Sequence, residues 1–268
     1  MIKKGVIAIF ILVIAIVIYS FIWGILFPWS PIKPGFNKVS YSNSSIFYPK
    51  NMSIPIDYSL IDHLMSETEK FHNWKFKKRV NIIVCATKSQ YQRFSTQRSP
   101  MCTMYTGSVI YVNPIIRDTK RDIKSFLKHE LSHAITFQNT TILKASKMKR
   151  WISEGLAVFY GNSHHYYQGK EFFTLAVDEG YFFEFIKNSG NIGHIPKDIR
   201  YSFEYAEYRY FIEYLVVNYG SDLFFKFVHQ YMLKPELEEE LFKQIYHLEL
   251  LDVFQRFKSE VMNKKWLT

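Results

Sequence analysis

The hydrophobic pattern of the chain begins with one long uninterrupted run. Residues Gly5 to Phe27 are 23 positions without a charge, rich in Ile, Val and Phe, and Pro28 and Trp29 follow directly. About 20 apolar residues span the hydrocarbon core of a bilayer, so the run predicts a transmembrane helix. A cleaved signal peptide would have a shorter apolar region and a small-residue cleavage site, and this chain continues Ile-Leu-Phe-Pro-Trp instead. We therefore expect an uncleaved anchor over residues 1–29.

Charges on the two sides of this run indicate its orientation. Lys3, Lys4 and the free amino terminus precede it, and Lys33 and Lys38 follow it. The positive-inside bias is thin, but it favours a cytoplasmic amino terminus. The rest of the chain is then expected outside the cytoplasm.

The remaining part, residues 30–268, is about 240 residues long, which is enough for one large domain with its own core. No repeat or low-complexity tract interrupts it. Residues Ser30 to Gly35 include Pro31 and Pro34 and predict a stiff juxtamembrane linker. We expect one domain after the anchor.

Polar and apolar positions predict strands in the first half of this domain and helices in the second. The first half has a short apolar stretch, an amphipathic helix, two strands on either side of a short helix, and a long helix with Asp118 or Thr119 as its N-cap. The second half has an aromatic helix ended by Tyr219 and Gly220, and a tail of two closing helices. The apolar stretch is 45–48 and the amphipathic helix 57–72. The two strands are 79–86 and 107–114, with the short helix 88–95 between them. The long helix ends near Phe137, the aromatic helix covers 203–215, and the closing helices lie in 235–257.

A metal-binding motif lies in the long helix. His129 and His133 are four positions apart in an HExxH sequence, so both imidazoles face the same side of a helix and can reach one ion. Zinc accepts imidazole nitrogen, and a catalytic zinc site has three protein ligands and one open position for water. Glu130 is about 100° further round the helix, beside the ion, where a base for that water belongs. The flanking residues are uncharged except Lys128, which suits a buried helix better than a surface one.

The third ligand does not follow the metzincin pattern HExxHxxGxxH, since positions 136 and 139 are Thr and Asn. Glu154 lies 21 positions after His133 in the segment Trp151-Ile152-Ser153-Glu154-Gly155-Leu156-Ala157. This segment resembles W-x-x-E-G-x-A of the peptidase MA-like domains, which belong to the gluzincin zinc metallopeptidases. The resemblance implies that Glu154 is the third zinc ligand. The other interpretation is a first-turn Glu stabilised by the positive end of a helix.

The resemblance has one departure and two further implications. Thermolysin-like enzymes have an acid four residues after the ligand Glu to orient a zinc histidine, and this chain has Val158 there. The aromatic helix resembles a family helix that follows the zinc site, which implies that Tyr205 donates a hydrogen bond to the oxyanion. In a chain with 19 Tyr, Tyr205 could equally be a packing residue. His164 and His165 are alternative ligands or donors, although both suit a surface position.

The strand 107–114 comes just before the HExxH helix, and the resemblance implies that it is the sheet edge that pairs with extended substrate. The same residues would also suit an ordinary edge strand. The resemblance covers roughly residues 79–257, and only the two metal segments are specific.

Cysteines and charge add less. Cys85 and Cys102 could form a disulfide outside the cytoplasm, or Cys85 could be a free thiol buried in a strand. The net charge of +10 becomes +8 without Lys3 and Lys4. This charge could favour an anionic membrane surface or acidic polymers, or simply solvate the protein. No nucleic-acid-binding pattern is present, so no nucleic-acid partner is expected.

Together these features predict an α+β, zincin-like domain with a small, mostly antiparallel sheet packed on the HExxH helix and a helical lobe after Glu154. The expected activity is hydrolysis of peptide bonds in a peptide or protein beside a membrane, with Zn²⁺ held by His129, His133 and Glu154. Two other classes are compatible with the sequence. One is a catalytically silent zinc-fold binding module, although Glu130 would be of no use to it. The other is a hydrolase of non-peptide amides such as cell-wall cross-links. The sequence does not set an oligomeric state.

Overall fold

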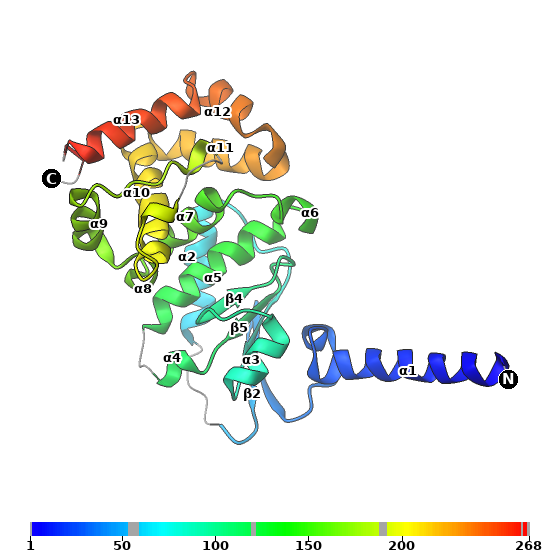
Figure 1. The fold of residues 1–268 in the computed structure, drawn as a ribbon. Coiled ribbons are helices and arrows are strands. Elements are labelled where there is room, and N and C mark those ends of the chain that lie inside the picture. The colour runs from blue at the N-terminus through cyan, green and yellow to red at the C-terminus, as the bar shows by residue number, and fades with distance from the viewer. Residues whose placement is uncertain (1, 53–58, 119–121, 188–191, 264, 267–268) are drawn as a thin grey trace.

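The computed structural model describes residues 2–52, 59–118, 122–187, 192–263 and 265–266. These residues form a mixed α+β fold that is mostly helical, with a small five-stranded sheet and one apolar helix at the amino terminus (Figure 1). The strands are β1 Phe36–Ser40, β2 Ser44–Pro49, β3 Val80–Val84, β4 Met101–Thr103 and β5 Val109–Val112. The helices around the sheet are α2 Ser59–His72, α3 Lys88–Ser95, α4 Ile115–Asp118 and α5 Ile123–Gln138.

The amino-terminal helix α1 spans Ile2–Trp23 and projects away from the rest of the molecule (Figure 1). Its segment Gly5–Trp23 is long and apolar enough to cross a membrane, and none of that segment is buried against the protein. The helix ends four residues before the apolar run does. Phe27, in the short 3-10 helix Phe27–Trp29, is buried and its ring stacks on that of Phe94 at 4.3 Å. The end of the run therefore packs on the domain instead of continuing the helix.

The sheet has the strand order β1-β2-β3-β5-β4. β1 and β4 pair antiparallel with their neighbours, whereas β2, β3 and β5 run parallel to one another. The predicted mostly antiparallel sheet is therefore wrong, and the sheet is mixed. The reason is that α2 separates β2 from β3, and α3 with β4 separates β3 from β5, so the chain has room to return and run in the same direction. The predicted substrate edge is also wrong, because β5 is internal and β4 forms that edge.

Both faces of the sheet are covered. Ile82 and Val84 of β3 face the main core, together with apolar residues of α2 and α5, whereas Ile83 faces a smaller cluster formed with α3 and Phe27. A strand buried on both faces needs an apolar residue at nearly every position, and β3 has the sequence VNIIV. The long helix α5 thus lies directly against the sheet and carries the HExxH residues into the interior.

The long helix begins later than predicted. Its N-cap is Asp122, whose side chain accepts a hydrogen bond from the backbone N–H of Lys124 at 3.0 Å. Asp118 is instead the last residue of the separate short helix α4, and Thr119 lies outside the described residues. The predicted N-cap is wrong because the sequence offers two good capping residues, Asp118 and Asp122, and α5 uses the second.

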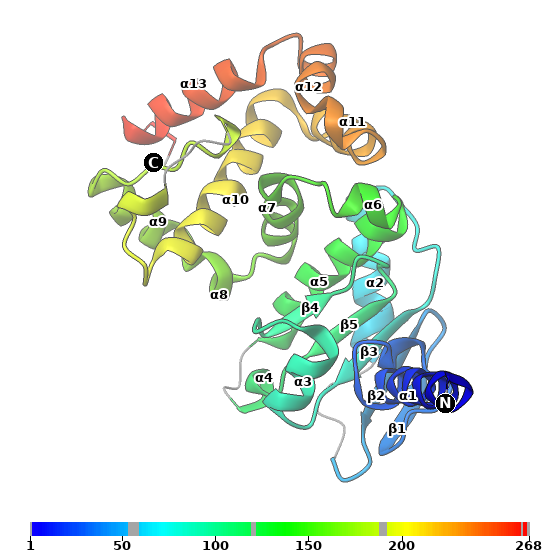
Figure 2. The ribbon, with the colours of Figure 1, turned by 45° about the vertical axis from the view of Figure 1, so that its right-hand side comes forward.

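The second half of the chain forms a helical lobe beside the sheet (Figure 2). Its core is aromatic: the ring of Phe211 lies 5.3–5.7 Å from the rings of Trp151, Phe185, Phe254 and Phe257. The aromatic helix and the two closing helices were predicted at the correct places. The elements are α6 Ile142–Ala145, α7 Arg150–Gly161, α8 His164–Tyr167, α9 Gly169–Asp178, α10 Arg200–Tyr219, α11 Ser221–Leu233, α12 Glu238–Tyr246 and α13 Leu250–Met262, with 3-10 turns at Phe185–Lys187, Ile192–His194 and Pro235–Leu237.

The two cysteines are both free thiols. Cys85 is buried just after β3, and Cys102 is partly buried on β4. Burial raises the pKa of the Cys102 thiol to about 12, so it is protonated at neutral pH.

Candidate metal centre

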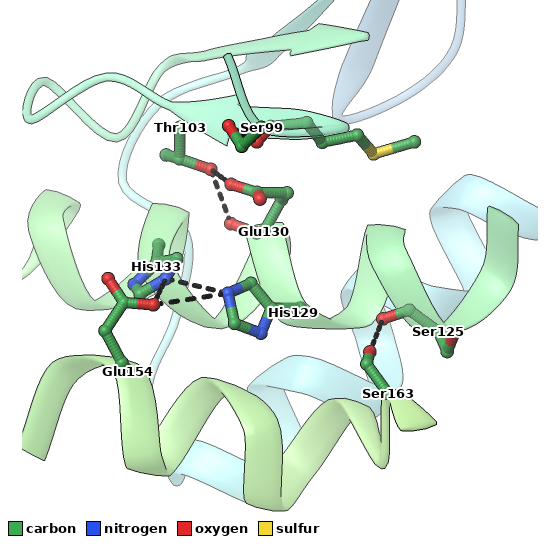
Figure 3. A network of polar contacts seen from close by, with 9 residues as sticks. Ser99, Thr103, Ser125, His129, Glu130, His133, Glu154 and Ser163 are labelled. Carbon is green, nitrogen blue, oxygen red and sulfur yellow. Dashed lines mark hydrogen bonds and ion pairs between the residues drawn. The ribbon is translucent and has the colours of Figure 1, made fainter. Parts of the chain in front are cut away.

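Two helices from different parts of the chain form the centre. α5 carries His129, Glu130 and His133, and α7 carries Glu154. The helices approach closely at Gly161, where an added Cβ would lie 3.1 Å from the backbone N of His129 and from the carbonyl O of Ser125. Such a contact is tight for any side chain, so glycine permits this approach. Nearby, the Ser163 hydroxyl donates to the Ser125 carbonyl at 2.9 Å, which joins the end of α7 to the start of α5 (Figure 3).

Gly155, directly after Glu154, has a similar role on the other side of α7. A Cβ there would lie 2.8 Å from Ile212 Cδ1 and 3.0 Å from Tyr208 Cβ, both on α10. The glycine of the E-G pair thus lets the aromatic helix pack directly against α7. This packing sets the rotation of α7 that turns Glu154 towards the histidines.

The three donor atoms form a nearly equilateral triangle (Figure 3). His129 Nε2 and His133 Nε2 are 3.2 Å apart, and Glu154 Oε2 lies 3.5 Å from the first and 3.3 Å from the second. We call this set the donor triangle. Ligand atoms at about 2.0–2.1 Å from a tetrahedral zinc ion are separated by roughly 3.3–3.4 Å. The donor triangle therefore has the dimensions and the chemistry, two imidazoles and one carboxylate, that a catalytic zinc ion requires.

The electrostatics favour a cation at this place. Burial opposes ionisation of Glu154, but the facing histidines outweigh it and hold the pKa of its carboxyl well below the usual range. Burial likewise lowers the pKa of His133, and the charge and hydrogen bond of Glu154 reverse this and raise it. Glu154 is thus an anion at neutral pH, and it faces two buried imidazoles. Within the described residues, this is the one group of three or more His, Cys, Asp or Glu side chains with ligand atoms close enough to hold a metal.

The second ring nitrogen of His129, Nδ1, has no polar partner among the described residues. This atom is buried, and Val158, where thermolysin-like enzymes have an acid, is itself fully buried. The ring of His129 is instead stacked on Tyr166, with centroids 4.4 Å apart and planes 27° from parallel. Stacking limits rotation of the imidazole, which is the role that a hydrogen-bonded carboxylate has in known zinc sites.

Glu130 lies next to the donor triangle and is only 3 % exposed. Its Oε2 accepts a hydrogen bond from the Thr103 hydroxyl of β4 at 2.7 Å (Figure 3). Glu130 is adjacent to His129 in sequence, and its carboxylate is turned towards β4 of the sheet. It borders the same cavity of about 910 Å³ as the donor triangle.

Tyr205 borders this cavity and belongs to a row of neighbouring aromatic rings. Its ring lies 5.6 Å from Tyr166 and 4.4 Å from Tyr201. Burial and the charge of Glu154 raise the pKa of Tyr205 well above its usual range, so its hydroxyl keeps a proton to donate. The Arg150 guanidinium lies 5.8 Å over the Tyr205 ring and forms an ion pair with Glu204 at 2.8 Å.

His164 and His165 do not join the donor triangle. Both are exposed and border the cavity, and the ring of His165 packs 5.1 Å from that of Phe126. Three neighbours of the site were not predicted from the sequence: Thr103, Arg150 and Tyr166. None of them belongs to a recognisable motif, and with aromatic residues making up 18 % of the chain, a particular Tyr has no distinguishing signal.

The fold and the site thus describe a mixed α+β protein with a buried pair of histidines and a glutamate between two lobes. No model of a protein family and no curated protein matches the sequence. Among solved structures, a match is the crystal structure of a mutant of the M1 zinc metallopeptidase from Deinococcus radiodurans. The identity is 12 % and the TM-score 0.46, and the match covers 87 % of this chain and 51 % of that one. The chain thus spans about half the length of that protein, and the likeness is distant.

Proposed function

We propose that this protein is a zinc-dependent peptidase with His129, His133 and Glu154 as its metal ligands. The observation that carries the proposal is the donor triangle, with edges of 3.2, 3.3 and 3.5 Å, beside the buried carboxylate of Glu130. Two histidines and a glutamate leave a fourth tetrahedral position open, which distinguishes a catalytic zinc set from a closed structural one.

Each residue then has a chemical role. When bound, zinc would lower the pKa of water towards 7 and polarise the scissile carbonyl. Glu130 takes a proton from the attacking water and later delivers it to the leaving amine. Tyr205 donates a hydrogen bond to the oxyanion of the tetrahedral intermediate. The reaction is amide hydrolysis without a covalent enzyme intermediate.

The substrate would bind along the edge strand β4. Residues of β4 and of the loop before it, from Gln97 to Thr103, border the cavity, and β4 has one side without a strand partner among the described residues. An extended peptide can add to such an edge through backbone hydrogen bonds. The substrate class that fits is therefore a peptide or an unfolded segment of a protein.

The helix α1 would anchor this peptidase in a membrane, with the amino terminus in the cytoplasm and residues 30–268 outside it. Support comes from the apolar segment Gly5–Trp23, none of which is buried in the described structure, and from the two lysines that precede this segment. Because Phe27 packs on Phe94, little free chain separates the anchor from the domain. Substrates near the membrane surface would then be favoured.

Two other functions share parts of this site. A silent binding module would use the metal without Glu130, so a buried carboxylate beside the donor triangle speaks against it. A hydrolase of non-peptide amides, such as cell-wall cross-links, would use the same residues and differ only in the cleft.

The test uses the full chain purified in detergent, with zinc per chain and hydrolysis of a peptide panel measured together. Replacing Glu130 by Gln keeps the shape and removes the base, so we expect the rate to fall by roughly 10²–10⁴-fold with zinc content unchanged. Hydrolysis of amide-linked cell-wall fragments, but not of peptides, would favour the hydrolase of non-peptide amides. Zinc binding without hydrolysis of any substrate would favour the silent module, and absence of zinc after metal repletion would contradict the proposal.

A further inference from the structure

The Thr103 hydroxyl makes two short contacts to one residue. Its Oγ1 lies 2.7 Å from Oε2 of Glu130 and 2.9 Å from the Glu130 backbone carbonyl oxygen (Figure 3). Thr103 is the last residue of β4, and Glu130 is in the middle of α5. The contact therefore joins the edge strand to the residue next to the donor triangle.

The carboxylate is the better acceptor of the two. A threonine hydroxyl has one proton, and a hydrogen bond to a charged acceptor is stronger than one to a neutral carbonyl. The Glu130 carbonyl also lies inside a helix, where the backbone N–H four residues on supplies a donor. The geometry thus indicates that the hydroxyl proton goes mainly to Oε2, which leaves Oε1 for another partner.

The position of the hydroxyl is itself fixed. Thr103 pairs with Ile110 of β5 in the antiparallel ladder, so the sheet holds its backbone. A β-branched side chain also has restricted rotation about χ1. Glu130, in contrast, has three rotatable side-chain bonds and needs an external contact to hold its carboxylate in one place. Small displacements matter here, because about 1 Å of misplacement in an active site can cost roughly 10²-fold in rate.

We propose that Thr103 is a positioning residue that holds the Glu130 carboxylate in the orientation for proton transfer and fixes that carboxylate relative to the substrate-binding edge. This inference rests on the proposed function. A peptide paired with β4 would be in a fixed register with Thr103 and therefore with Glu130. One residue thus sets both the direction of the base and its distance from the bond to be cleaved.

The test compares two replacements in the full chain. Thr103→Val keeps the shape and the β-branch but removes the hydroxyl, and Thr103→Ser keeps the hydroxyl. For the peptide that the wild type cleaves best, we expect kcat of the Val variant to fall by about 10- to 100-fold, with KM and zinc content nearly unchanged. The Ser variant should recover most of this loss. In a Glu130→Gln background, Thr103→Val should cause little further loss, because the group that it positions is gone.

A matched control is Thr140→Val. The Thr140 hydroxyl donates to the Met232 carbonyl at 2.7 Å, away from the cavity, so its loss removes a similar hydrogen bond without touching Glu130. Its kcat should stay within about twofold of the wild type, since a hydrogen bond far from the cavity affects stability and not the position of the Glu130 carboxylate. Equal loss of kcat in Thr103→Ser and Thr103→Val, or an unchanged kcat in Thr103→Val, would overturn the proposal.

A crystal structure of Thr103→Val separates this proposal from the proposed function. If the wild type cleaves no peptide, the peptidase assignment fails, and the position of the Glu130 carboxylate still decides what Thr103 does. A carboxylate that has turned away from β4 supports the positioning role. A carboxylate that has not moved overturns it.

Discussion

Two pairs of histidines in this protein differ in what faces them. His129 and His133 turn their Nε2 atoms towards Glu154 in the donor triangle. His72, at the end of α2, is 1 % exposed, and its Nε2 makes no hydrogen bond to the described residues. His229 of α11 donates from Nε2 to the His72 carbonyl at 2.9 Å and stacks on Trp74.

The pKa values of His72 and His133 shift in opposite directions. Burial, with the charges of His229 and His133, lowers the pKa of His72 to about 3, so it is neutral at any physiological pH. The pKa of His133 is raised in spite of burial, because Glu154 faces it. A buried histidine that no carboxylate faces is therefore neutral at physiological pH. A candidate metal site needs buried imidazoles that converge on one point and a carboxylate at the same point.

The largest expected effect is on zinc binding. His133→Ala removes one of three ligands, so we expect the zinc affinity of the full chain to fall by roughly 100-fold or more, since loss of a partner outside the ligand set alone costs 10–100-fold. The measurement is competition with a chelator of known affinity. The control, His229→Ala, removes a histidine from the other pair and should leave zinc affinity within about twofold. Equal affinities in the wild type and His133→Ala would show that the donor triangle is not the zinc site.

The next effect is on stability and depends on pH. The folded chain does not protonate His72 until about pH 3, whereas the unfolded chain does so near pH 6.5. Because the unfolded state then binds more protons, the free energy of unfolding should decrease by about 1.4 kcal/mol per pH unit as the pH falls below 6.5. In His72→Phe, which has a similar shape and nothing to protonate, this part of the decrease should be absent.

Denaturant unfolding of both proteins between pH 7 and pH 5 measures the difference. Other groups titrate in both proteins, so the informative quantity is the difference between their slopes. Parallel slopes for the wild type and His72→Phe would mean that His72 becomes protonated in the folded state, and the contrast between the two pairs would disappear.

Much of the candidate metal site could be proposed from the sequence, because the spacing of its histidines carries the chemistry. Positions i and i+4 of a helix face the same way in any protein, so His129 and His133 were brought together by local geometry alone. Glu154 needed the resemblance to a known family, since its approach depends on how α7 packs. That packing depends on Gly155 and Gly161, and the sequence does not show which helices pack closely against these two glycines.

Features that depend on long-range pairing were missed. β4 has three residues and no alternating pattern, and its pairing with β5 made it the edge of the sheet. Thr103 reaches Glu130 across 27 residues of sequence for the same reason. The predicted strand direction was wrong as well. The helix predicted between β2 and β3 is long enough to act as a crossover, and such a crossover allows the two strands to run parallel.

The smallest expected effect concerns the contact between α2 and α11. The ring centroids of Trp74 and His229 are 4.2 Å apart in the wild type. His229→Phe keeps a ring to stack on Trp74 but removes the hydrogen bond to the His72 carbonyl. We expect a loss of about 1 kcal/mol in the free energy of unfolding at pH 7, with zinc affinity and kcat unchanged. Denaturant unfolding measures the first, and chelator competition and peptide hydrolysis measure the others. A change in zinc affinity would mean that the two histidine pairs are coupled through α2 and α5, and that His72 and His229 influence the metal site.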